Sequence, residues 1–335
     1  MSVLLVDGDN LLTIGFYGVK NYFYKGDHIG GLYHFINTLR KSFELYKLDK
    51  IVVFWDGEDG AATRKKMYSR YKENRRQRIR SDKEKESYTK QRRRVQQYLE
   101  ELYVRQGEFE FCEADDCIAE YAQRSTENTI VYSSDGDLAQ LASDTTRIYN
   151  PSHRKLYRQN DIIQYQHQDL HIQIVKIVCG DRSDNITGIY NLGIKKMLKL
   201  FPELKTRPVT LNEIIERSNE LFEEDKNNKT VKNLLTGVTK YGIYGEEFFN
   251  LNESIVSLDQ PFLTGEARET ITDLIHENLD PEGRSYKNTM KMMMEDGMFT
   301  VLPKSDDAWV KFLNPFLRLT RKEKNKRIIK IKNHD

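Results

Sequence analysis

The chain has 335 residues, enough for one large domain or two ordinary ones, and 38% of them are hydrophobic, enough to build a core. Lysine and arginine (53) nearly balance aspartate and glutamate (51), so the net charge is only +2. No apolar run is longer than about five residues, which excludes a membrane-spanning helix. The three cysteines lack CxxC spacing and no signal peptide precedes the first strand-like run, which indicates a cytoplasmic protein.

The first half of the chain alternates between runs typical of strands and runs typical of amphipathic helices. We expect strands at 3–6, 51–55, 109–112 and 129–134, and helices at 30–47, 95–106, 115–125 and 135–143. This alternation predicts an α/β fold with a mostly parallel sheet flanked by helices. Residues 57–95 are highly charged and show almost no apolar periodicity.

The pattern changes after about residue 172. Residues 172–201 predict a helix, a glycine-containing turn and a second helix, and the chain from 208 to 300 is helical in tendency. The tail at 318–332 is basic. We therefore expect an α/β domain over residues 1–172 and a helical region over residues 173–335.

Several strand-like runs end in carboxylates. The acidic residues that follow these runs are Asp7, Asp56, Glu113, Asp115, Asp116, Asp135 and Asp137. Two more, Asp181 and Asp184, follow the Cys179-Gly180 pair. Because the carboxyl ends of parallel strands share one edge of a sheet, we expect these side chains to converge in one cleft. Each one alone could be a helix cap or an acidic first-turn residue, but strands do not usually end so consistently in Asp or Glu.

Carboxylates that meet in one cleft repel one another, and bound divalent cations balance their negative charge. Ligand sets made only of oxygen select hard ions such as Mg²⁺ or Mn²⁺ over zinc. Together with the long basic stretches elsewhere in the chain, the carboxylates predict metal-dependent phosphodiester chemistry.

The motifs resemble, in order, those of the 5′-nuclease family, which comprises flap endonucleases, phage 5′-exonucleases and the 5′-nuclease domain of bacterial DNA polymerase I. The matching motifs are V-D-G (6–8), Asp56 after an apolar strand, Y-K-E-N-R (71–75), E-A-D-D (113–116), S-S-D-G-D (133–137) and G-D-R-S-D-N (180–185). They cover roughly residues 1–200. The resemblance implies a PIN-like α/β fold and a stand-alone nuclease of the kind that some phages and bacteria encode.

By this resemblance, two sets of carboxylates would each hold one metal ion. The first set is Asp7, Asp56, Glu113 and Asp115, with Asp116 alongside, and the second set is Asp135, Asp137, Asp181 and Asp184. Two Mg²⁺ or Mn²⁺ ions about 4 Å apart can activate a water molecule and stabilise the leaving oxygen of an in-line displacement. The carboxylates themselves would not attack the phosphate.

The charged segment supports the same interpretation. Between residues 64 and 94, fifteen basic residues stand against four acidic ones, an excess that a solvated helix does not normally show. The interleaved Tyr71 could stack on unpaired bases. In the family this stretch forms an arch over the active site, and the resemblance assigns Lys72 and Arg75 to catalysis and Arg64 and Lys65 to DNA contacts.

Residues 186–196 resemble the helix-hairpin-helix element of the family. Gly188 and Gly193 would permit backbone approach to phosphates, and Lys195 and Lys196 would add positive charge there. Asn191 stands where the family often has glycine, and because asparagine tolerates the left-handed conformation we expect the turn to survive. A K⁺ ion, which such hairpins often bind, is a further candidate ligand.

The resulting hypothesis is a structure-specific 5′-nuclease that cuts DNA near junctions of duplex and 5′ single strand. Its expected substrates are branched or 5′-ended DNA, with RNA/DNA hybrids and replication proteins as candidate further partners of a monomeric enzyme. Two alternatives stay open: a PIN-like endoribonuclease, which shares the acidic sheet edge, and a non-catalytic branched-DNA-binding protein. The full set of carboxylates weighs against the second alternative.

Overall fold

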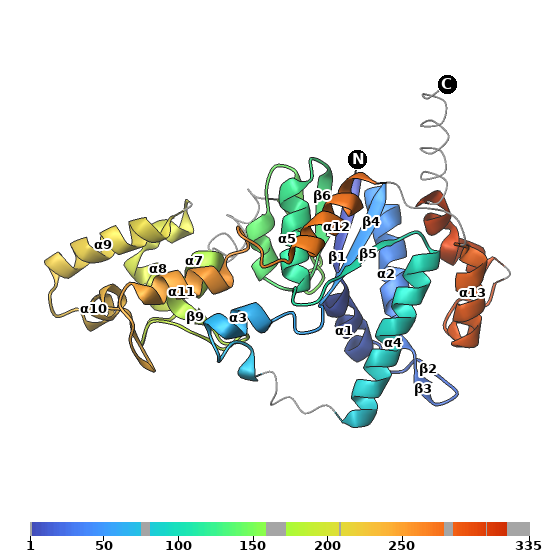
Figure 1. Cartoon of the computed structure of the whole chain (residues 1–335), viewed down its shortest axis with the longest axis horizontal. Helices are drawn as coiled ribbons and strands as arrows, with labels where there is room; N and C mark the ends of the chain where they lie inside the picture. The colour runs from blue at the N-terminus through green and yellow to red at the C-terminus, as the bar shows by residue number, and fades with distance from the viewer. Residues whose placement is uncertain are drawn as a thin grey trace, which may run out of the picture.

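The computed structural model describes residues 2–74, 81–158, 172–207, 209–277, 284–305 and 307–319. The central sheet consists of β1 (Ser2–Asp7), β4 (Lys50–Trp55), β5 (Arg105–Glu108), β6 (Asn128–Tyr132), β7 (Thr146–Asn150) and β8 (Lys155–Tyr157). The strand order is β5-β4-β1-β6-β7-β8, and all neighbouring strands are parallel except β7 and β8 (Figure 1). The predicted α/β fold with a mostly parallel sheet is therefore confirmed.

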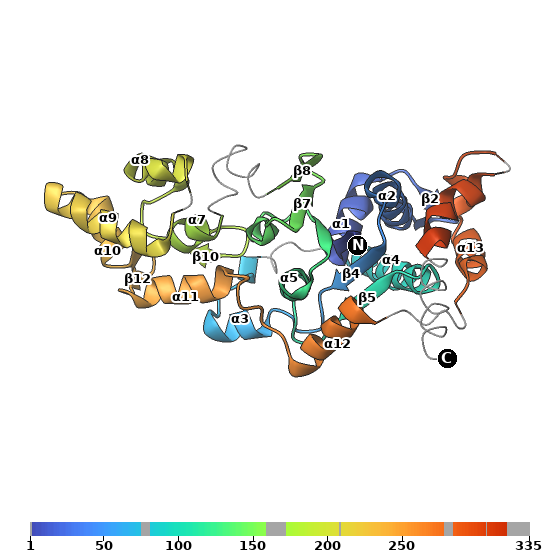
Figure 2. The same ribbon diagram turned by 90° about the horizontal axis from the view of Figure 1, so that it is seen from above.

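Helices cover both faces of this sheet (Figure 2). One face carries α1 (Gly8–Gly18), α2 (Gly30–Tyr46) and α4 (Asp82–Glu101), and the other carries α5 (Ala114–Arg124) and α12 (Gly265–His276). Successive side chains of a strand point to opposite faces. In β1, Leu4 and Val6 accordingly pack in the first core and Val3 and Leu5 in the second, and none of the four is exposed. A strand buried on both faces explains the continuous apolar run in the sequence.

A helical lobe lies at one end of the molecule (Figures 1 and 2). Its elements are α7 (Ile172–Cys179), β9 (Gly180–Asp181), β10 (Ile186–Thr187), α8 (Ile194–Leu200), α9 (Leu211–Glu224), α10 (Lys229–Leu235), β11 (Val238–Thr239), β12 (Gly242–Ile243) and α11 (Glu247–Val256). The lobe has a core of its own, which includes Ile177, Phe201 and Phe248. The predicted helix, turn and helix at 172–201 correspond to α7, the β9–β10 region and α8.

After the lobe, the chain returns to the sheet. Helix α12 packs on α5, and α13 (Tyr286–Glu295) packs on α4 at the opposite end of the molecule from the lobe (Figure 1). Met293, Met298 and Phe316 are buried in the same core as Leu4 and Val6. The described residues between 265 and 319, which we had placed in the helical region, thus contribute to the cores on both faces of the sheet.

Two predicted elements differ from the structure. The helix expected at 95–106 starts earlier and ends at Glu101, because Tyr103 adopts a left-handed backbone conformation with φ 61° that breaks the helix. The strand expected at 109–112 was wrong: strand β5 ends at Glu108. Phe111, with φ 63°, lies in a turn in which the Cys112 N–H donates to the Phe109 carbonyl. Phe109 and Cys112 pack in the second core without joining the sheet, whereas Phe111 is exposed.

Secondary structure also forms in the highly charged segment and in a small hairpin before α2. The highly charged segment at 57–95 contains α3 (Ala62–Met67) and the first part of α4, and residues 75–80 between them lie outside the described ranges. A small hairpin, β2 (Phe23–Tyr24) with β3 (Asp27–His28), precedes α2. In the described part of the chain, no helix has the length and apolar character needed to cross a membrane.

Candidate functional site

Carboxylates gather at one edge of the sheet. Asp7 is the last residue of β1, Asp56 directly follows β4, and Asp135 lies three residues beyond the end of β6. Asp115 comes from the first turn of α5, the helix after β5. Because β5, β4, β1 and β6 are consecutive in the sheet, their carboxyl ends bring these four side chains to one edge. We call Asp7, Asp56, Asp115 and Asp135 the first carboxylate group.

The pKa values of Asp7 and Asp115 are raised, first by burial and then by the charges of neighbouring carboxylates. Burial, followed by the charge of Asp56, raises the pKa of Asp7 to about 8. Burial and then the charges of Asp135 and Asp7 raise the pKa of Asp115 well above its usual range. The members of the group therefore resist being ionised together unless a cation balances their charge.

A second carboxylate group consists of Asp137, Asp181 and Asp184. Asp137 begins the 3₁₀ helix η2 (Asp137–Leu141), whereas Asp181 and Asp184 come from the lobe, at β9 and in the turn before β10. Each of the three offers an oxygen within 4.8 Å of the other two. The sequence placed Asp135 in the second set, but its charge acts on Asp7 and Asp115 as well as on Asp137, so Asp135 lies between the two groups.

Both groups suit hard divalent ions. Their donors are carboxylate oxygens, the ligand type that Mg²⁺ and Mn²⁺ prefer. The spacing in the second group is close to that around a single ion, because ligand oxygens about 2.1 Å from Mg²⁺ lie roughly 3 to 4 Å apart. The residues present therefore fit the metal ions that the sequence predicted.

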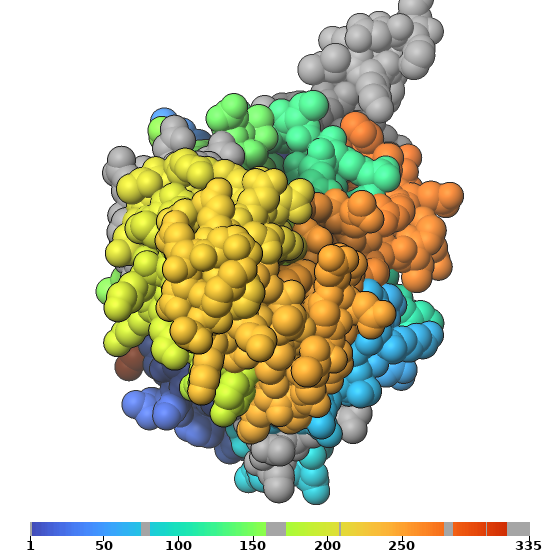
Figure 3. Space-filling model, turned by 90° about the vertical axis from the view of Figure 1, so that its left-hand side faces the viewer, coloured from blue at the N-terminus to red at the C-terminus, as the bar shows by residue number. Residues whose placement is uncertain are grey.

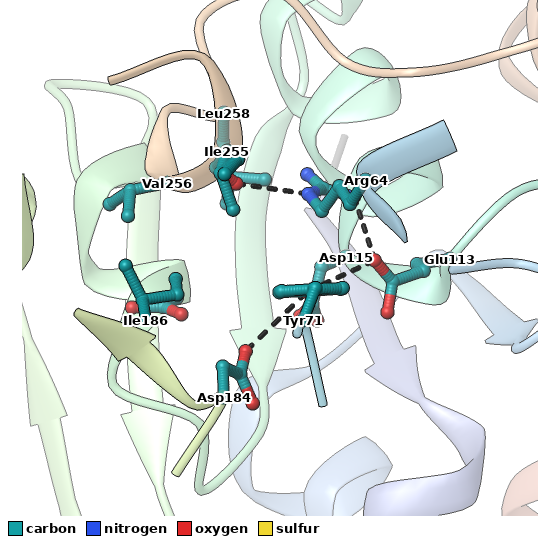
Figure 4. Close-up of a pocket in the computed structure, with 10 residues that line it drawn as sticks. Arg64, Tyr71, Glu113, Asp115, Asp184, Ile186, Ile255, Val256 and Leu258 are labelled. Atoms are coloured by element: carbon teal, nitrogen blue, oxygen red, sulfur yellow. Dashed lines mark hydrogen bonds and ion pairs between the residues drawn. The ribbon is translucent and has the colours of Figure 1, made fainter. Parts of the chain in front are cut away.

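Two predicted metal ligands already have protein partners. Asp116 is fully buried, and both of its oxygens accept hydrogen bonds from the Arg64 guanidinium at 2.6 and 2.9 Å. Glu113 accepts hydrogen bonds from Arg64 at 2.8 Å and from the Tyr71 hydroxyl at 3.2 Å (Figure 4). It also pairs with Lys72. Assigning Asp116 as a ligand was therefore wrong in this structure, because its oxygens hold Arg64 in place.

Arg64 and Tyr71 are not positioned to contact DNA, contrary to the prediction. Arg64 is 4% exposed and also donates to the Ile255 carbonyl at 2.9 Å, which ties α3 to the lobe. Tyr71 is 5% exposed, and its hydroxyl lies between Glu113 and Asp184 (Figure 4). Because Arg64 is buried, a DNA phosphate cannot reach its guanidinium. Because Tyr71 is buried, a base cannot stack on its ring. Lys65, next to Arg64 on α3, is only partly buried, and within the described residues it forms no ion pair.

The Arg64→Met variant should be much less stable than the unsubstituted protein, because it leaves the buried carboxylates of Asp116 and Glu113 without their partner. We expect a loss of about 3–5 kcal/mol in the free energy of unfolding, measured by urea denaturation. Lys65→Met on the same helix is the matched control and should cost little stability. If Arg64→Met kept full stability and instead weakened DNA binding, Arg64 would be a DNA contact after all.

Lys72 lies at the junction of the two groups. Its ammonium pairs with Glu113, and its backbone N–H donates to the Asp184 carbonyl at 2.8 Å. The neighbouring Asn74 side chain donates to the Arg182 carbonyl at 2.7 Å, and the Asn185 side chain donates to the Arg70 carbonyl at 2.8 Å. The base of the basic segment is thus fastened to the loop that carries Asp181 and Asp184. Arg75, the second predicted catalytic residue, lies outside the described residues.

The hairpin residues divide into two kinds. Lys195, Lys196 and Gly193 lie on the surface at the start of α8, and a Cβ at Gly193 would meet nothing within 4 Å. Gly188 differs, because a Cβ there would come within 2.0 Å of the Cys179 carbonyl; this glycine is required by packing, not by an approaching phosphate. Asn191 adopts the left-handed conformation with φ 59°, as expected, and its carbonyl accepts a hydrogen bond from Lys196 at 2.9 Å.

Three functional side chains were missed from the sequence. Arg92 of α4 forms an ion pair with Asp9 at 3.0 Å, and the Asp9 carboxylate also accepts the Asp56 N–H at 3.1 Å. Lys176 of α7 pairs with both Asp137 and Asp181. Burial raises the pKa of Asp137 to about 6 even though the lysine opposes the shift. At Asp181 burial also acts to raise the pKa, but Lys176 and the hydrogen bonds from Ser183 together outweigh it, and the pKa is lowered. Nothing in the local sequence signals these partners, because they come from distant elements.

Comparison with known proteins places the chain among nucleases. The family model described as 5′-3′ exonuclease, N-terminal resolvase-like domain, matches residues 2–169. The 5′-3′ exonuclease of Halalkalibacterium halodurans is 28% identical over 295 residues, which cover 83% of this chain and 92% of that protein. DNA polymerase I of Bacillus subtilis is 28% identical over 240 residues, which cover 67% of this chain but 26% of the polymerase.

Two solved structures share the fold. The zinc-bound 5′-exonuclease of T5 has a TM-score of 0.61, covering 89% of this chain and 99% of its own, with 18% identity. A bacteriophage T5 flap endonuclease in complex with DNA and metal ions has a TM-score of 0.60, covering 96% of this chain and all of its own, also with 18% identity. At 18% sequence identity, these two comparisons show that the fold is shared and nothing more.

Proposed function

Because the chain belongs to the 5′-3′ exonuclease family, as its motifs predicted, we propose that it is a divalent-metal-dependent 5′-nuclease that cuts DNA near junctions of duplex and 5′ single strand. One observation carries this proposal: carboxylates from the ends of β1, β4 and β6, from α5 and from the lobe meet beside Lys72. A non-catalytic DNA-binding protein would not need this arrangement, since carboxylates repel phosphates.

Each of the two carboxylate groups would bind one metal ion. Asp7, Asp56, Asp115 and Asp135 would hold one ion, and Asp137, Asp181 and Asp184 the other. Bound there, divalent ions supply an activated water molecule and neutralise charge on the leaving oxygen. The protein positions these ligands by hydrogen bonds. The Asp7 side chain accepts a hydrogen bond from the Asn10 N–H at 3.0 Å, and the Asp56 side chain accepts one from the Ala114 N–H at 2.9 Å. These bonds fix both carboxylates on rigid elements.

Lys72 is a described basic side chain beside the first carboxylate group, where its charge acts on Asp56 and Asp115. Its side chain is 15% exposed and pairs with Glu113, so the ammonium is directed at the carboxylate edge and not into solvent. A phosphate entering the site would find this charge in place, and the charge would offset the negative charge that builds on the phosphoryl oxygens during the reaction. Arg75 would add a second positive group from the adjoining part of the basic segment.

The DNA would contact both sides of the site. The basic segment at 57–95 would act as an arch for the 5′ single strand, and the hairpin at 186–196 would hold the duplex. The end of the molecule shown in Figure 3 is formed by the lobe, coloured yellow to orange, with α3 beside it in blue. A T5 flap endonuclease of the same fold was solved with DNA and metal ions, which supports DNA as the ligand of this fold. RNA primers, a K⁺ ion at the hairpin and replication proteins remain predicted partners.

The direct test is cleavage of a 5′-labelled flap DNA with and without Mg²⁺, alongside single-stranded RNA of the same sequence. We expect short 5′ products from the flap only with Mg²⁺, and much slower cleavage of the RNA. Preferred cleavage of the RNA would favour a PIN-like endoribonuclease. Tight binding of the flap without cleavage at any Mg²⁺ or Mn²⁺ concentration would favour a non-catalytic protein.

The hairpin can be tested separately. The double variant Lys195→Ala, Lys196→Ala should bind flapped duplexes more weakly, and the slope of log K against log salt should fall by about one for each phosphate that the variant no longer neutralises. Cleavage at saturating DNA should stay within roughly tenfold, because neither lysine belongs to the carboxylate groups. If the salt slope of binding does not change, the hairpin is only a structural turn.

A further inference from the structure

A lysine from the lobe lies inside the second carboxylate group. Lys176 forms ion pairs with Asp137 and Asp181, and its nitrogen is 2.6 Å from an oxygen of Asp181. The lysine side chain is 14% exposed, so these ion pairs are largely screened from solvent. The backbone of helix α7 is anchored in the lobe, because the Asn252 side chain donates to the Ile177 carbonyl at 2.8 Å and the Ile189 N–H donates to the Val178 carbonyl at 2.9 Å.

The ammonium and a divalent ion would use the same oxygens. Asp137 and Asp181, with Asp184, are the three side chains whose oxygens lie within 4.8 Å of one another. An ion bound about 2.1 Å from those oxygens would come within a few ångströms of the lysine nitrogen, where two positive charges repel strongly. Both cations cannot occupy this place together, so one must leave before the other binds.

The first carboxylate group has no such internal cation. Within the described residues, no lysine or arginine forms an ion pair with Asp7, Asp56, Asp115 or Asp135. Their direct partners are neutral groups, such as the Ser133 hydroxyl at 3.2 Å from Asp7 and the Ala114 N–H at Asp56. The two groups therefore differ: Lys72 acts on Asp56 and Asp115 without pairing with them, whereas Lys176 forms ion pairs with two members of the second group.

We propose that Lys176 is a built-in cation of the second metal position, which it occupies in the DNA-free protein and vacates when the second ion binds. Metal binding then proceeds in two unequal steps, with a tight first step at the first carboxylate group and a weak second step at Asp137, Asp181 and Asp184. The lysine can leave because its stem is flexible and its ammonium is a compact, readily hydrated charge. This inference rests on the metal centre of the proposed function, and it adds the order in which the two metal ions bind there.

The test is calorimetric titration of the DNA-free protein with Mn²⁺, which reports binding without any cleavage. The unsubstituted protein should show one tight and one weak step. In Lys176→Met the second step should be at least about tenfold tighter, because no ammonium has to be displaced. Lys176→Arg should keep the second step weak, since a guanidinium pairs with two carboxylates at least as well. Lys199→Met, an exposed lysine on α8, is the matched control and should leave both steps unchanged.

Thermal melting provides a second readout. Lys176→Met leaves Asp137 and Asp181 without their counter-charge, so its melting temperature without metal should fall, and Mn²⁺ should raise it more than it raises that of the unsubstituted protein. Should Lys176→Met not fold, Lys176→Gln gives the same comparison, because its amide can donate to a carboxylate without carrying charge.

Two results separate the inference from the proposed function. An unchanged second step in the folded Lys176→Met or Lys176→Gln protein would overturn the inference and leave the metal centre intact. Absence of any Mn²⁺ binding by the unsubstituted protein would overturn the metal centre and the inference with it. Two unequal steps that Lys176→Met makes nearly equal would support the inference even if the flap assay detected no cleavage.

Discussion

Replacing Asp115 by asparagine is expected to reduce DNA cleavage at least about a thousandfold while leaving DNA binding intact or slightly tighter. Asp115 occupies the centre of the first carboxylate group, where burial and the charges of Asp135 and Asp7 act on it together. Asparagine has nearly the same shape, so the packing of α5 should survive. It lacks the negative charge that a divalent ion requires, and removing that charge also lessens repulsion of the phosphate.

The measurement is single-turnover cleavage of a flap DNA at saturating Mg²⁺, together with binding in Ca²⁺ or EDTA. Asp59→Asn is the matched control. Asp59 is exposed and has a left-handed backbone with φ 51°, a conformation that asparagine accepts readily, so this variant should cleave normally. Normal cleavage by Asp115→Asn would remove Asp115 from the metal centre and with it the assignment of the first group.

Lys72→Met should lower the single-turnover rate by about a hundredfold to a thousandfold while changing the dissociation constant for DNA only slightly. The reason is that the contact of its ammonium strengthens as negative charge develops on the phosphoryl oxygens, so its removal costs more in the transition state than in the bound substrate. Rates and affinities should be measured on the same flap DNA.

The control for this variant is Lys66→Met. Lys66 is an exposed residue of α3, six positions earlier in the same basic segment, and forms no ion pair within the described residues. Lys66→Met should change the salt dependence of binding at most, and not the rate at saturating DNA. A defect of Lys72→Met that vanishes at saturating DNA would reassign Lys72 to ordinary backbone binding.

The sequence by itself determined the architecture at the level of layers. Buried strands between two helical layers must be apolar throughout, so 3–6 and 51–55 could be recognised as central strands from their residues alone. The acidic residues after those strands could be assigned to one edge because parallel strands present their carboxyl ends on the same side. Asp7 and Asp56 were expected at this edge for that reason, and in the structure their charges act together on Asp115.

Only the tertiary structure decided which polar side chains face the chemistry and which hold the fold. The sequence treats Arg64 and Lys65 alike, as neighbouring positive charges, but folding buries Arg64 between Asp116 and Glu113 and leaves Lys65 near the surface. Lys176 is an ordinary helical lysine until the lobe packs against η2 and places its ammonium between Asp137 and Asp181. The physical reason is that a local pattern fixes the face of an element, whereas the partner of a buried charge is set by contacts between residues distant in sequence.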